Sequence, residues 1–379
     1  MNERKLGLQW VSPFARDERR GGWAGMSYGL RQSLAAGGVD IRDAAPLKAV
    51  HDPFAKWASR CLTLLMGRRL VWSASRRALR GAAGEYTRRD SGGDGVLFFG
   101  AADYLAVYPR HPFACFLDSA FVPFLESYAG GRRYLQAELD RLAAAEQRWL
   151  RACGRVMTTS RFAADEIVRR YGVDPARVVA VGTGPTGSVP DRPRDADAAP
   201  RPNVLFVSTD FERKGGWLAV EAAARARKSV ADLELHIVGP VPADVDATDG
   251  LVLHGWIDQS SAEGRRRFED ILRASRLFLI LSRVDLTPAA ICEASAAGVP
   301  TMAFGVGGIP EMVRHGRTGW ILSPATGVEG IAEALVSAVT DAGCTGMGRK
   351  ARRLYETDWN WQVVSERVMR ALQEMIGDA

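Results

Sequence analysis

Short apolar segments alternate with helical patterns along the whole chain, and this alternation begins twice. The first series opens with LGLQWV and the second with NVLFVS, and residues 182–202 between them (GTGPTGSVPDRPRDADAAPRP) are rich in Pro, Asp and Gly. Alternating strands and helices predict a parallel sheet that is covered by helices on both faces. The 379 residues also exceed the size of one ordinary core. We therefore predict two Rossmann-like α/β domains that face each other across a cleft.

The boundary between the two domains is expected in the Pro-, Asp- and Gly-rich segment. We place the first domain at residues 1–190 and the second at residues 191–357. The last helical pattern, within residues 358–379, is expected to pack back on the first domain. Residues 182–187 match GxGxxG, but SVPDRPRD follows them instead of an amphipathic helix. This argues against a nicotinamide or flavin dinucleotide site.

Composition excludes several classes of protein. The chain is 47% hydrophobic and 25% charged, no run of about 18 uncharged apolar residues occurs, and MNERKLGLQW does not resemble a signal peptide. We therefore expect a cytoplasmic protein. The five cysteines are scattered without a CxxC pair or a His partner, which predicts reduced, mostly buried thiols and no metal site.

Positive charge is concentrated in one segment of the first domain. Residues 51–90 contain nine basic and three acidic residues, an excess equal to the +6 of the whole chain. Within this segment, residues 56–80 interleave arginines with apolar side chains. Such a pattern is typical of a helix at an anionic membrane surface, at the inner membrane face, or of a site for an acidic acceptor. It equally fits a core-facing helix with a solvated basic face. No nucleic-acid-binding motif accompanies the charge.

The stretch DLTPAAICEASAAGVP (285–300) carries the main candidate site of the second domain. Thr287 is a good N-cap and Pro288 suits the first helical position, so we predict a helix from there to a C′ glycine at Gly298. The N–H groups of Ala289 and Ala290 would then be unpaired at a positive helix end that attracts phosphate. Two carboxylates flank that end, at positions 285 and 293, where they could accept hydrogen bonds from sugar hydroxyls. The alternative is a capped helix with a solvated glutamate.

Two further turns point to the same end of the second sheet. Arg213 and Lys214 follow NVLFVS, and Gly215 precedes the next helix, so two cations are expected where a diphosphate could bind. A second glycine cluster, residues 305–308, follows the strand TMAF. Turns at the carboxyl ends of parallel strands mark the crevice in which α/β sheets bind ligands. Two ordinary charges in a solvated turn remain the alternative for the Arg-Lys pair.

Together these motifs resemble the sugar-donor domain of GT-B glycosyltransferases, in the large retaining family often called family four. Residues 202–324 carry the resemblance. The E-x7-E motif corresponds to Asp285 and Glu293, its continuation to EASAAGVP, and the GG-x-x-E motif to GGIPE (307–311). HGRTGWIL resembles a further strand of the family. In the first half, RRGGWAGMSYGLRQSLAAGG and VMTTSRFAADEIVRRYGVDPARVVAVGTG are similar to the glycine loop and the end of the acceptor domain. Two departures stand out, because Asp285 replaces a glutamate and Thr209 stands where the family commonly has an arginine.

The resemblance implies a retaining transferase that moves a hexosyl or related sugar from a nucleotide diphosphate sugar, with UDP or GDP, to a glycan, lipid-linked or small-molecule acceptor. It implies ribose hydroxyls on Glu293, sugar hydroxyls near Asp285, a diphosphate on the cations and the helix end, and no metal. Asp118, at a strand end, is the candidate acceptor-side group, and Gly21 and Gly22 could let the backbone approach the sugar donor. The implied catalytic residues are Asp118, Asp285, Arg213 and Lys214, and the implied donor-binding residues are Gly22, Gly215, Thr287, Ala289, Ala290 and Glu293. A GT-B epimerase or phosphorylase-like enzyme, or a non-catalytic nucleotide-sugar-binding protein, are the alternatives.

Overall fold

The computed structural model describes residues 5–18, 22–43, 47, 51–128, 133–193 and 201–377. The chain divides into two compact units, Met1–Gly182 together with Val364–Ala379, and Thr183–Val363. The chain therefore passes between the units near residue 182 and again near residue 363. The domain limits expected from sequence, at 190/191 and about 357/358, stay predictions, as does the cleft. Gly21 lies outside the described residues.

The first unit is built on a six-stranded parallel sheet with the order β2-β1-β3-β4-β5-β6. Its strands are β1 (Gly7–Val11), β2 (Asp40–Asp43), β3 (Gly95–Phe99), β4 (Phe113–Leu117), β5 (Arg155–Thr158) and β6 (Val178–Ala180). Its helices are α1 (Gly22–Ala36), α2 (Pro53–Met66), α3 (Arg76–Arg89), α4 (Phe121–Ser127), α5 (Gln136–Ala152) and α6 (Arg161–Tyr171), with 3-10 turns η1 (Trp72–Ala74) and η3 (Pro175–Arg177). Strands β1, β3 and β4 are buried throughout, as central strands of a parallel sheet must be.

The last helix, α13 (Trp361–Gly377), contributes most of its length to the first unit. The Ser365 hydroxyl lies 2.8 Å from the Ser33 hydroxyl of α1, and Arg155 at the start of β5 lies 3.6 Å from Glu374. Gly154, just before β5, has no room for a side chain, because a Cβ there would meet Met375. Residues 364–377 are therefore a packed part of this unit.

The second unit contains the other six-stranded parallel sheet, with the order β12-β11-β10-β7-β8-β9. Its strands are β7 (Asn203–Val207), β8 (Glu234–Val238), β9 (Leu251–Gly255), β10 (Leu277–Ile280), β11 (Thr301–Phe304) and β12 (Gly319–Leu322). Its helices are α7 (Gly216–Ala226), α8 (Ala262–Ala274), α9 (Ala289–Ala296), α10 (Ile309–Met312), α11 (Val328–Thr340) and α12 (Cys344–Asp358). The strand order reverses between β7 and β10, which are hydrogen-bonded neighbours.

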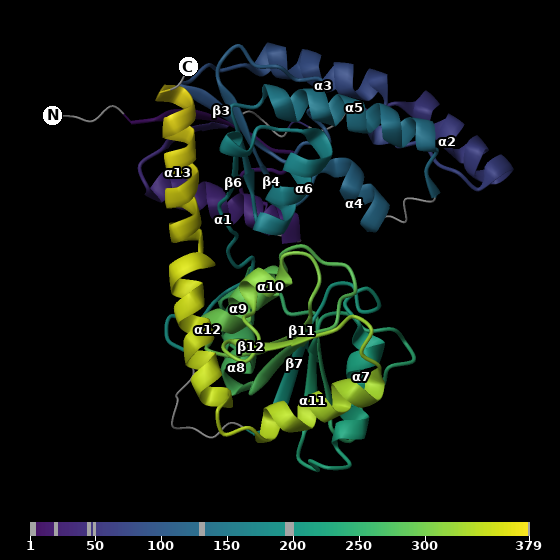
Figure 1. Ribbon diagram of the computed structural model, residues 1–379, viewed down its shortest axis with the longest axis vertical. Helices are drawn as coiled ribbons and strands as arrows, with labels where there is room; N and C mark the ends of the chain where they lie inside the picture. The colour runs from purple at the N-terminus through teal and green to yellow at the C-terminus, as the bar shows by residue number, and fades with distance from the viewer. Residues whose placement is uncertain are drawn as a thin grey trace. The chain divides into compact units, whose positions relative to one another are not determined.

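Each central strand of the second unit sends alternate side chains into two separate cores. In β7, Val204 and Phe206 join the core under α7 and α11, whereas Leu205 joins the core under α8, α9 and α12. Figure 1 shows these helices on the two sides of the sheet. Successive side chains of a strand point to opposite faces of the sheet, and both faces are buried here. This explains the consecutive apolar residues in NVLFVS. The prediction of α/β units with helix-covered parallel sheets is confirmed.

The basic segment of the first unit is interpreted from its sequence either as a binding surface or as a core-facing helix with a solvated basic face. It forms α2, η1 and α3, but Ser59 is the one residue of α2 that is buried. The interpretation as a core-facing helix with a solvated basic face is therefore wrong for α2, whose large apolar side chains are mostly exposed. It holds for α3, where Leu79 is buried and Arg76 and Arg80 are exposed. No described helix is both long and apolar enough to cross a bilayer. All five cysteines are free thiols, and four of them are buried.

Candidate functional site

The candidate site lies where the strand order of the second sheet reverses. The segment after β7 (208–215) and the segment after β10 (281–288) leave adjacent strands at their carboxyl ends, the place where doubly wound sheets bind ligands. Backbone hydrogen bonds join these segments, because the Leu281 N–H donates to the Lys214 carbonyl at 3.1 Å. The Gly308 N–H donates to the Leu286 carbonyl at 2.8 Å and attaches the glycine cluster after β11. The three predicted turns are thus brought together.

Two glycines permit this close approach of backbones. Gly215 has φ +82°, and a Cβ there would lie 2.5 Å from the carbonyl oxygen of Leu281. Gly307 has φ +53°, and a Cβ there would overlap the carbonyl oxygen of Asp285. Both positions combine a left-handed backbone with contact to another backbone, so only glycine suits them. The glycines fix the turns against one another.

A compact charge cluster occupies the junction of the two segments. The Lys214 ammonium forms a short ion pair with Oδ2 of Asp285, and the Leu286 N–H donates to Oδ1 at 3.1 Å. Arg213 Nη1 lies 4.0 Å from the same Oδ2, while its Nε donates to Asp210 at 3.0 Å. Asp285 is buried, with 8% of its surface exposed. The two cations are therefore held by carboxylates.

Burial dominates the electrostatics of the lysine. Desolvation lowers the pKa of Lys214 from its ordinary value, and the charge of Asp285 and its hydrogen bond act in the opposite direction. Neighbouring Arg213 adds a further downward contribution to this pKa. Burial disfavours the protonated form of Lys214, and the carboxylate of Asp285 stabilises it. A second anion, such as a diphosphate, would therefore stabilise this cation strongly.

Helix α9 begins one residue later than predicted. The N-cap is Pro288 in an extended conformation, with no side-chain cap, and Ala289 is the first helical residue. The prediction of Thr287 as the N-cap is therefore wrong. At both the N-cap and the first helical position the backbone N–H makes no hydrogen bond within the helix. Proline, which lacks this N–H, therefore fits both positions. The C-terminal end is as predicted, because Ala297 is the C-cap and Gly298 follows it with φ +73°.

The helix start still presents backbone donors beside the charge cluster. Ala289 and Ala290 are the first two residues of α9, and the first recorded turn is the Ile291 N–H donating to the Pro288 carbonyl at 3.0 Å. N–H groups at the first two positions of a helix have no partner within the helix. Their side chains are methyl groups, which leaves the backbone open to close approach.

Glu293 is a buried carboxylate in α9, and a distant segment holds it. Its Oε1 accepts hydrogen bonds from the Gly187 N–H at 2.8 Å and from the Thr186 N–H and hydroxyl, each at 3.2 Å. Desolvation raises the pKa of Glu293, and these hydrogen bonds offset part of that rise. Oε2 accepts no hydrogen bond from the residues that the structure describes, so one oxygen is left for a ligand hydroxyl.

The 184–187 segment is therefore part of the site region, which sequence reasoning missed. Trp361 Nε1 donates to the Pro185 carbonyl at 2.7 Å, and a Cβ at Gly184 would meet the Trp361 ring. Thr186 and Gly187 then lie on the Glu293 carboxylate. These contacts join residues more than 100 positions apart, so the GTGPTG pattern alone could not predict them.

The first-unit candidates are Asp118, directly after β4, and Gly22, at the start of α1. Asp118 follows β4 and is half-buried; it is not the cap of α4, whose N-cap is Ala120. Gly22 is the first residue of α1, and a Cβ there would meet nothing within 4 Å. Fully buried Glu146 accepts hydrogen bonds from the first N–H groups of α4 and from the Tyr171 hydroxyl, which fixes the helix after Asp118.

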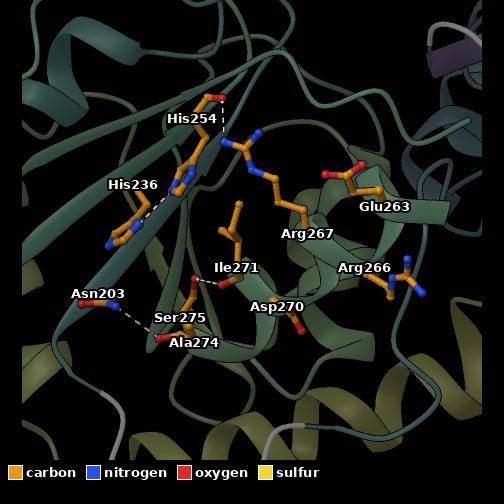
Figure 2. Close-up of a pocket in the computed structure, with 10 residues that line it drawn as sticks. All are labelled: Asn203, His236, His254, Glu263, Arg266, Arg267, Asp270, Ile271, Ala274 and Ser275. Atoms are coloured by element: carbon orange, nitrogen blue, oxygen red, sulfur yellow. Dashed lines mark hydrogen bonds between the residues drawn. The ribbon is translucent and has the colours of Figure 1, made fainter. Parts of the chain in front are cut away.

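A hollow of about 620 Å³ in the second unit lies between α8 and strands β7 to β9 (Figure 2). Asn203 in its wall is the first residue of β7, so the hollow lies away from the carboxyl end that carries the charge cluster. Figure 2 shows His236 and His254 beside each other, 3.0 Å apart. The wall carries charged residues of both signs, Glu263, Arg266, Arg267 and Asp270. Among the described residues, no three His, Cys, Asp or Glu side chains converge as metal ligands.

Comparison with known proteins gives a family likeness for the second unit. The family model described as Glycosyl transferases group 1 matches residues 201–341, which hold β7 to β12 and all three turns. These residues form a glycosyl transferases group 1 domain. The glycogen synthase of Mycobacterium tuberculosis is 28% identical over 286 residues, covering 70% of this chain and 66% of that enzyme. The chain thus spans just under two thirds of this curated relative.

Solved structures extend the likeness beyond the glycosyl transferases group 1 domain to the whole chain. A sucrose-phosphate synthase from Thermosynechococcus elongatus matches with a TM-score of 0.69 at 17% identity, over 99% of this chain and 100% of that one. The Anabaena protein HepE, solved in complex with UDP, matches with a TM-score of 0.60 at 12% identity, over 98% of this chain and 100% of that one. The chain therefore has the GT-B fold, and the fold prediction is confirmed.

Proposed function

We propose that this protein is a glycosyltransferase that moves a hexosyl or related sugar from a nucleotide diphosphate sugar to an acceptor hydroxyl, with retention of configuration. The observation that carries the proposal is the meeting of Arg213, Lys214 and the start of α9 at the switch point of a glycosyl transferases group 1 domain. Two cations and free backbone donors in one place suit a diphosphate. Because HepE was solved with UDP, UDP is the first nucleotide to test, with GDP second.

The diphosphate is the centre of the proposed chemistry. The bond between the anomeric carbon and the phosphate oxygen breaks, and its electron pair stays on the departing diphosphate. In the bound complex, Lys214, Arg213 and the α9 N–H groups face the oxygens on which this negative charge develops, so they stabilise the transition state more than the bound substrate. Removing one such group typically costs about 2.7 to 4 kcal/mol of transition-state stabilisation.

The acidic residues orient the sugar nucleotide in this proposal. Asp285 accepts hydrogen bonds from hydroxyls of the transferred sugar once Lys214 has turned to the diphosphate, and Glu293 accepts hydrogen bonds from ribose hydroxyls through Oε2. An aspartate reaches one methylene less far than a glutamate, but the ion pair holds Asp285 within the cluster. Arg213 supplies the charge that Thr209 lacks, because its guanidinium already lies 4.0 Å from Asp285.

The acceptor side rests on the first unit. A new bond forms between the acceptor oxygen and the anomeric carbon, and the acceptor proton passes to the departing phosphate. Asp118 orients the acceptor hydroxyl from the carboxyl end of β4, and Gly22 lets the α1 backbone approach the sugar donor. The likeness to a protein named glycogen synthase favours a glycan acceptor. Lipid-linked and small-molecule acceptors are tested beside it.

The first experiment is a thermal-shift panel of UDP-, GDP-, ADP- and dTDP-sugars, because a bound ligand raises the melting temperature. Release of nucleoside diphosphate is then measured with the stabilising sugar donor and candidate acceptors, and NMR of the product gives its anomeric configuration. If the protein binds a sugar donor but neither hydrolyses it nor transfers its sugar, it is a non-catalytic nucleotide-sugar-binding protein. An inverted product would refute retention.

A matched pair of substitutions tests the role of Arg213. Arg213 is 35% exposed and pairs with Asp210, and Arg225 in α7 is 38% exposed and pairs with Glu221. We expect Arg213→Glu to lower turnover about a hundredfold or more, with a change in melting temperature similar to that of Arg225→Glu, whose turnover stays near wild type. Equal losses of turnover in the two variants would contradict the proposal.

A further inference from the structure

Helix α2 carries an exposed apolar surface. Phe54, Trp57, Leu64 and Leu65 are 69%, 60%, 87% and 83% exposed, respectively. At 3.6 residues per turn these four positions fall within about 100° of the helix circumference, so they form one stripe. We call these four residues the α2 stripe. A contiguous group of large apolar side chains on a surface marks an interaction site.

A cationic pocket borders the α2 stripe. This hollow of about 590 Å³ lies between α2, residues 69–73 and α4, and we call it the α2 pocket. Lys56, Arg60 and Arg69 line it, and no described residue in its wall is acidic. None of these three cations forms an ion pair with any acidic residue that the structure describes. Three cations with no carboxylate partner among the described residues create a positive potential that attracts an anion.

The pocket and the stripe are parts of one surface. Leu64 belongs to both, since it lines the pocket and is the most exposed member of the stripe. The Lys56 ammonium lies 5.3 Å from the centre of the Trp72 ring, which holds it at the pocket wall. Along α2, the helical positions of Lys56 and Arg60 fall between the buried Ser59 side and the stripe. An anionic group in the pocket would therefore lie directly beside apolar material on the stripe.

We propose that this surface binds anionic phospholipid at a membrane, with a phosphate headgroup in the α2 pocket and the α2 stripe inserted among the acyl chains. The chemistry of the occupant follows from the order of the groups, a cluster of cations followed by large apolar side chains, which matches the boundary between headgroups and hydrocarbon. The positive excess of residues 51–90 adds attraction toward an anionic bilayer. This proposal does not depend on the sugar chemistry of the second unit.

Vesicle flotation tests the proposal directly. The full-length protein is mixed at low salt with vesicles of phosphatidylcholine alone or of phosphatidylcholine with phosphatidylglycerol. We expect binding to the mixed vesicles, weakening as salt is added, and at least about tenfold less binding to phosphatidylcholine alone. Failure to float with the mixed vesicles at low salt would overturn the proposal.

Two matched pairs of variants locate the binding surface. Trp57→Ser should lower vesicle affinity about tenfold, whereas Trp256→Ser, at a residue 61% exposed in the second unit, should leave it unchanged. Arg60→Glu should lower affinity about tenfold to thirtyfold, and Arg80→Glu, exposed on α3 but outside the α2 pocket, less than threefold. All four side chains are exposed, so unchanged circular dichroism and melting temperature should accompany these changes.

Other outcomes would assign the surface differently. Equal losses with Arg60→Glu and Arg80→Glu would mean that general positive charge acts instead of the pocket. A concentration-dependent dimer in light scattering that Trp57→Ser abolishes, without vesicle binding, would make a second copy of the chain the partner. The first result would overturn the headgroup site in the α2 pocket, and the second would overturn the lipid proposal, whatever the activity of the second unit.

Discussion

The ion pair between Lys214 and Asp285 is a structural part of the second unit as well as a proposed part of the site. Both side chains are largely buried, at 15% and 9% exposed. Breaking one partner of a buried pair typically costs about 3–5 kcal/mol, because the other charge is left unpaired. In Lys214→Met the carboxylate keeps the Leu286 N–H and Arg213 at 4.0 Å, so the lower end of this range, about 3 kcal/mol, is expected.

The double variant distinguishes an ion pair from two independent contacts. Lys214→Met and Asp285→Asn should each cost about 3 kcal/mol, and the double variant should cost no more than either alone, since it leaves no unpaired charge. The coupling energy would then be at least about 3 kcal/mol. Asparagine keeps an oxygen that can accept from the Leu286 N–H, so the local turn is preserved.

Urea unfolding followed by tryptophan fluorescence measures the free energies of this double-mutant cycle. If the two units unfold separately, the transition that the substitutions shift is compared between the variants. As a second measurement, about 3 kcal/mol should lower the melting temperature of a unit of this size by roughly 6–12 °C. Turnover should stay low in all three variants, because restored stability does not restore the cation or the carboxylate. Additive single effects, with coupling below about 0.5 kcal/mol, would refute the reasoning, as would recovery of turnover in the double variant.

Two further predictions concern the same turns. Burial raises the pKa of Glu293, so the native state retains this proton to higher pH than the unfolded chain does. The free energy of unfolding of wild type, relative to that of Glu293→Gln, should therefore fall as pH rises from about 4.5 through the raised pKa. A pH series of unfolding free energies checks this, and a difference that grows in favour of wild type would contradict it. Gly307→Ala should cost at least about 1–2 kcal/mol from its left-handed backbone alone, plus the displacement of Asp285, and a melting curve unchanged from wild type would exclude the close approach described here.

The strands were predictable from sequence because a parallel sheet buries both faces of each strand. NVLFVS and LFLILS are apolar at consecutive positions, and both form central strands of the second unit. The end of α9 was equally clear, since Gly298 supplies the left-handed residue that ends a helix. Its start was harder to fix, because threonine and proline in sequence offer two caps and only the local backbone decides between them.

Contacts between distant segments could not be predicted. Nothing near Glu293 in the sequence indicates that Thr186 and Gly187 donate to its carboxylate. The exposure of α2 was also undecided, because a helix with apolar and basic residues has the same pattern whether its apolar stripe meets a core or the solvent. Only packing separates these outcomes, and in this chain α2 packs through Ser59.

The charge cluster has a consequence for how the site takes its ligand. It pairs two cations, Arg213 and Lys214, with two carboxylates, Asp210 and Asp285, so its net charge is zero before the ligand binds. A diphosphate must then compete with Asp285 for the lysine, and part of its binding energy is used to exchange one partner for another. Asp285→Asn removes this competitor, so the variant should bind the preferred nucleoside diphosphate more tightly than wild type, by about tenfold for each 1.4 kcal/mol released, while sugar transfer falls. Isothermal titration with the nucleoside diphosphate measures the change, and weaker binding by Asp285→Asn would show that the carboxylate positions the lysine for the diphosphate instead of competing with it.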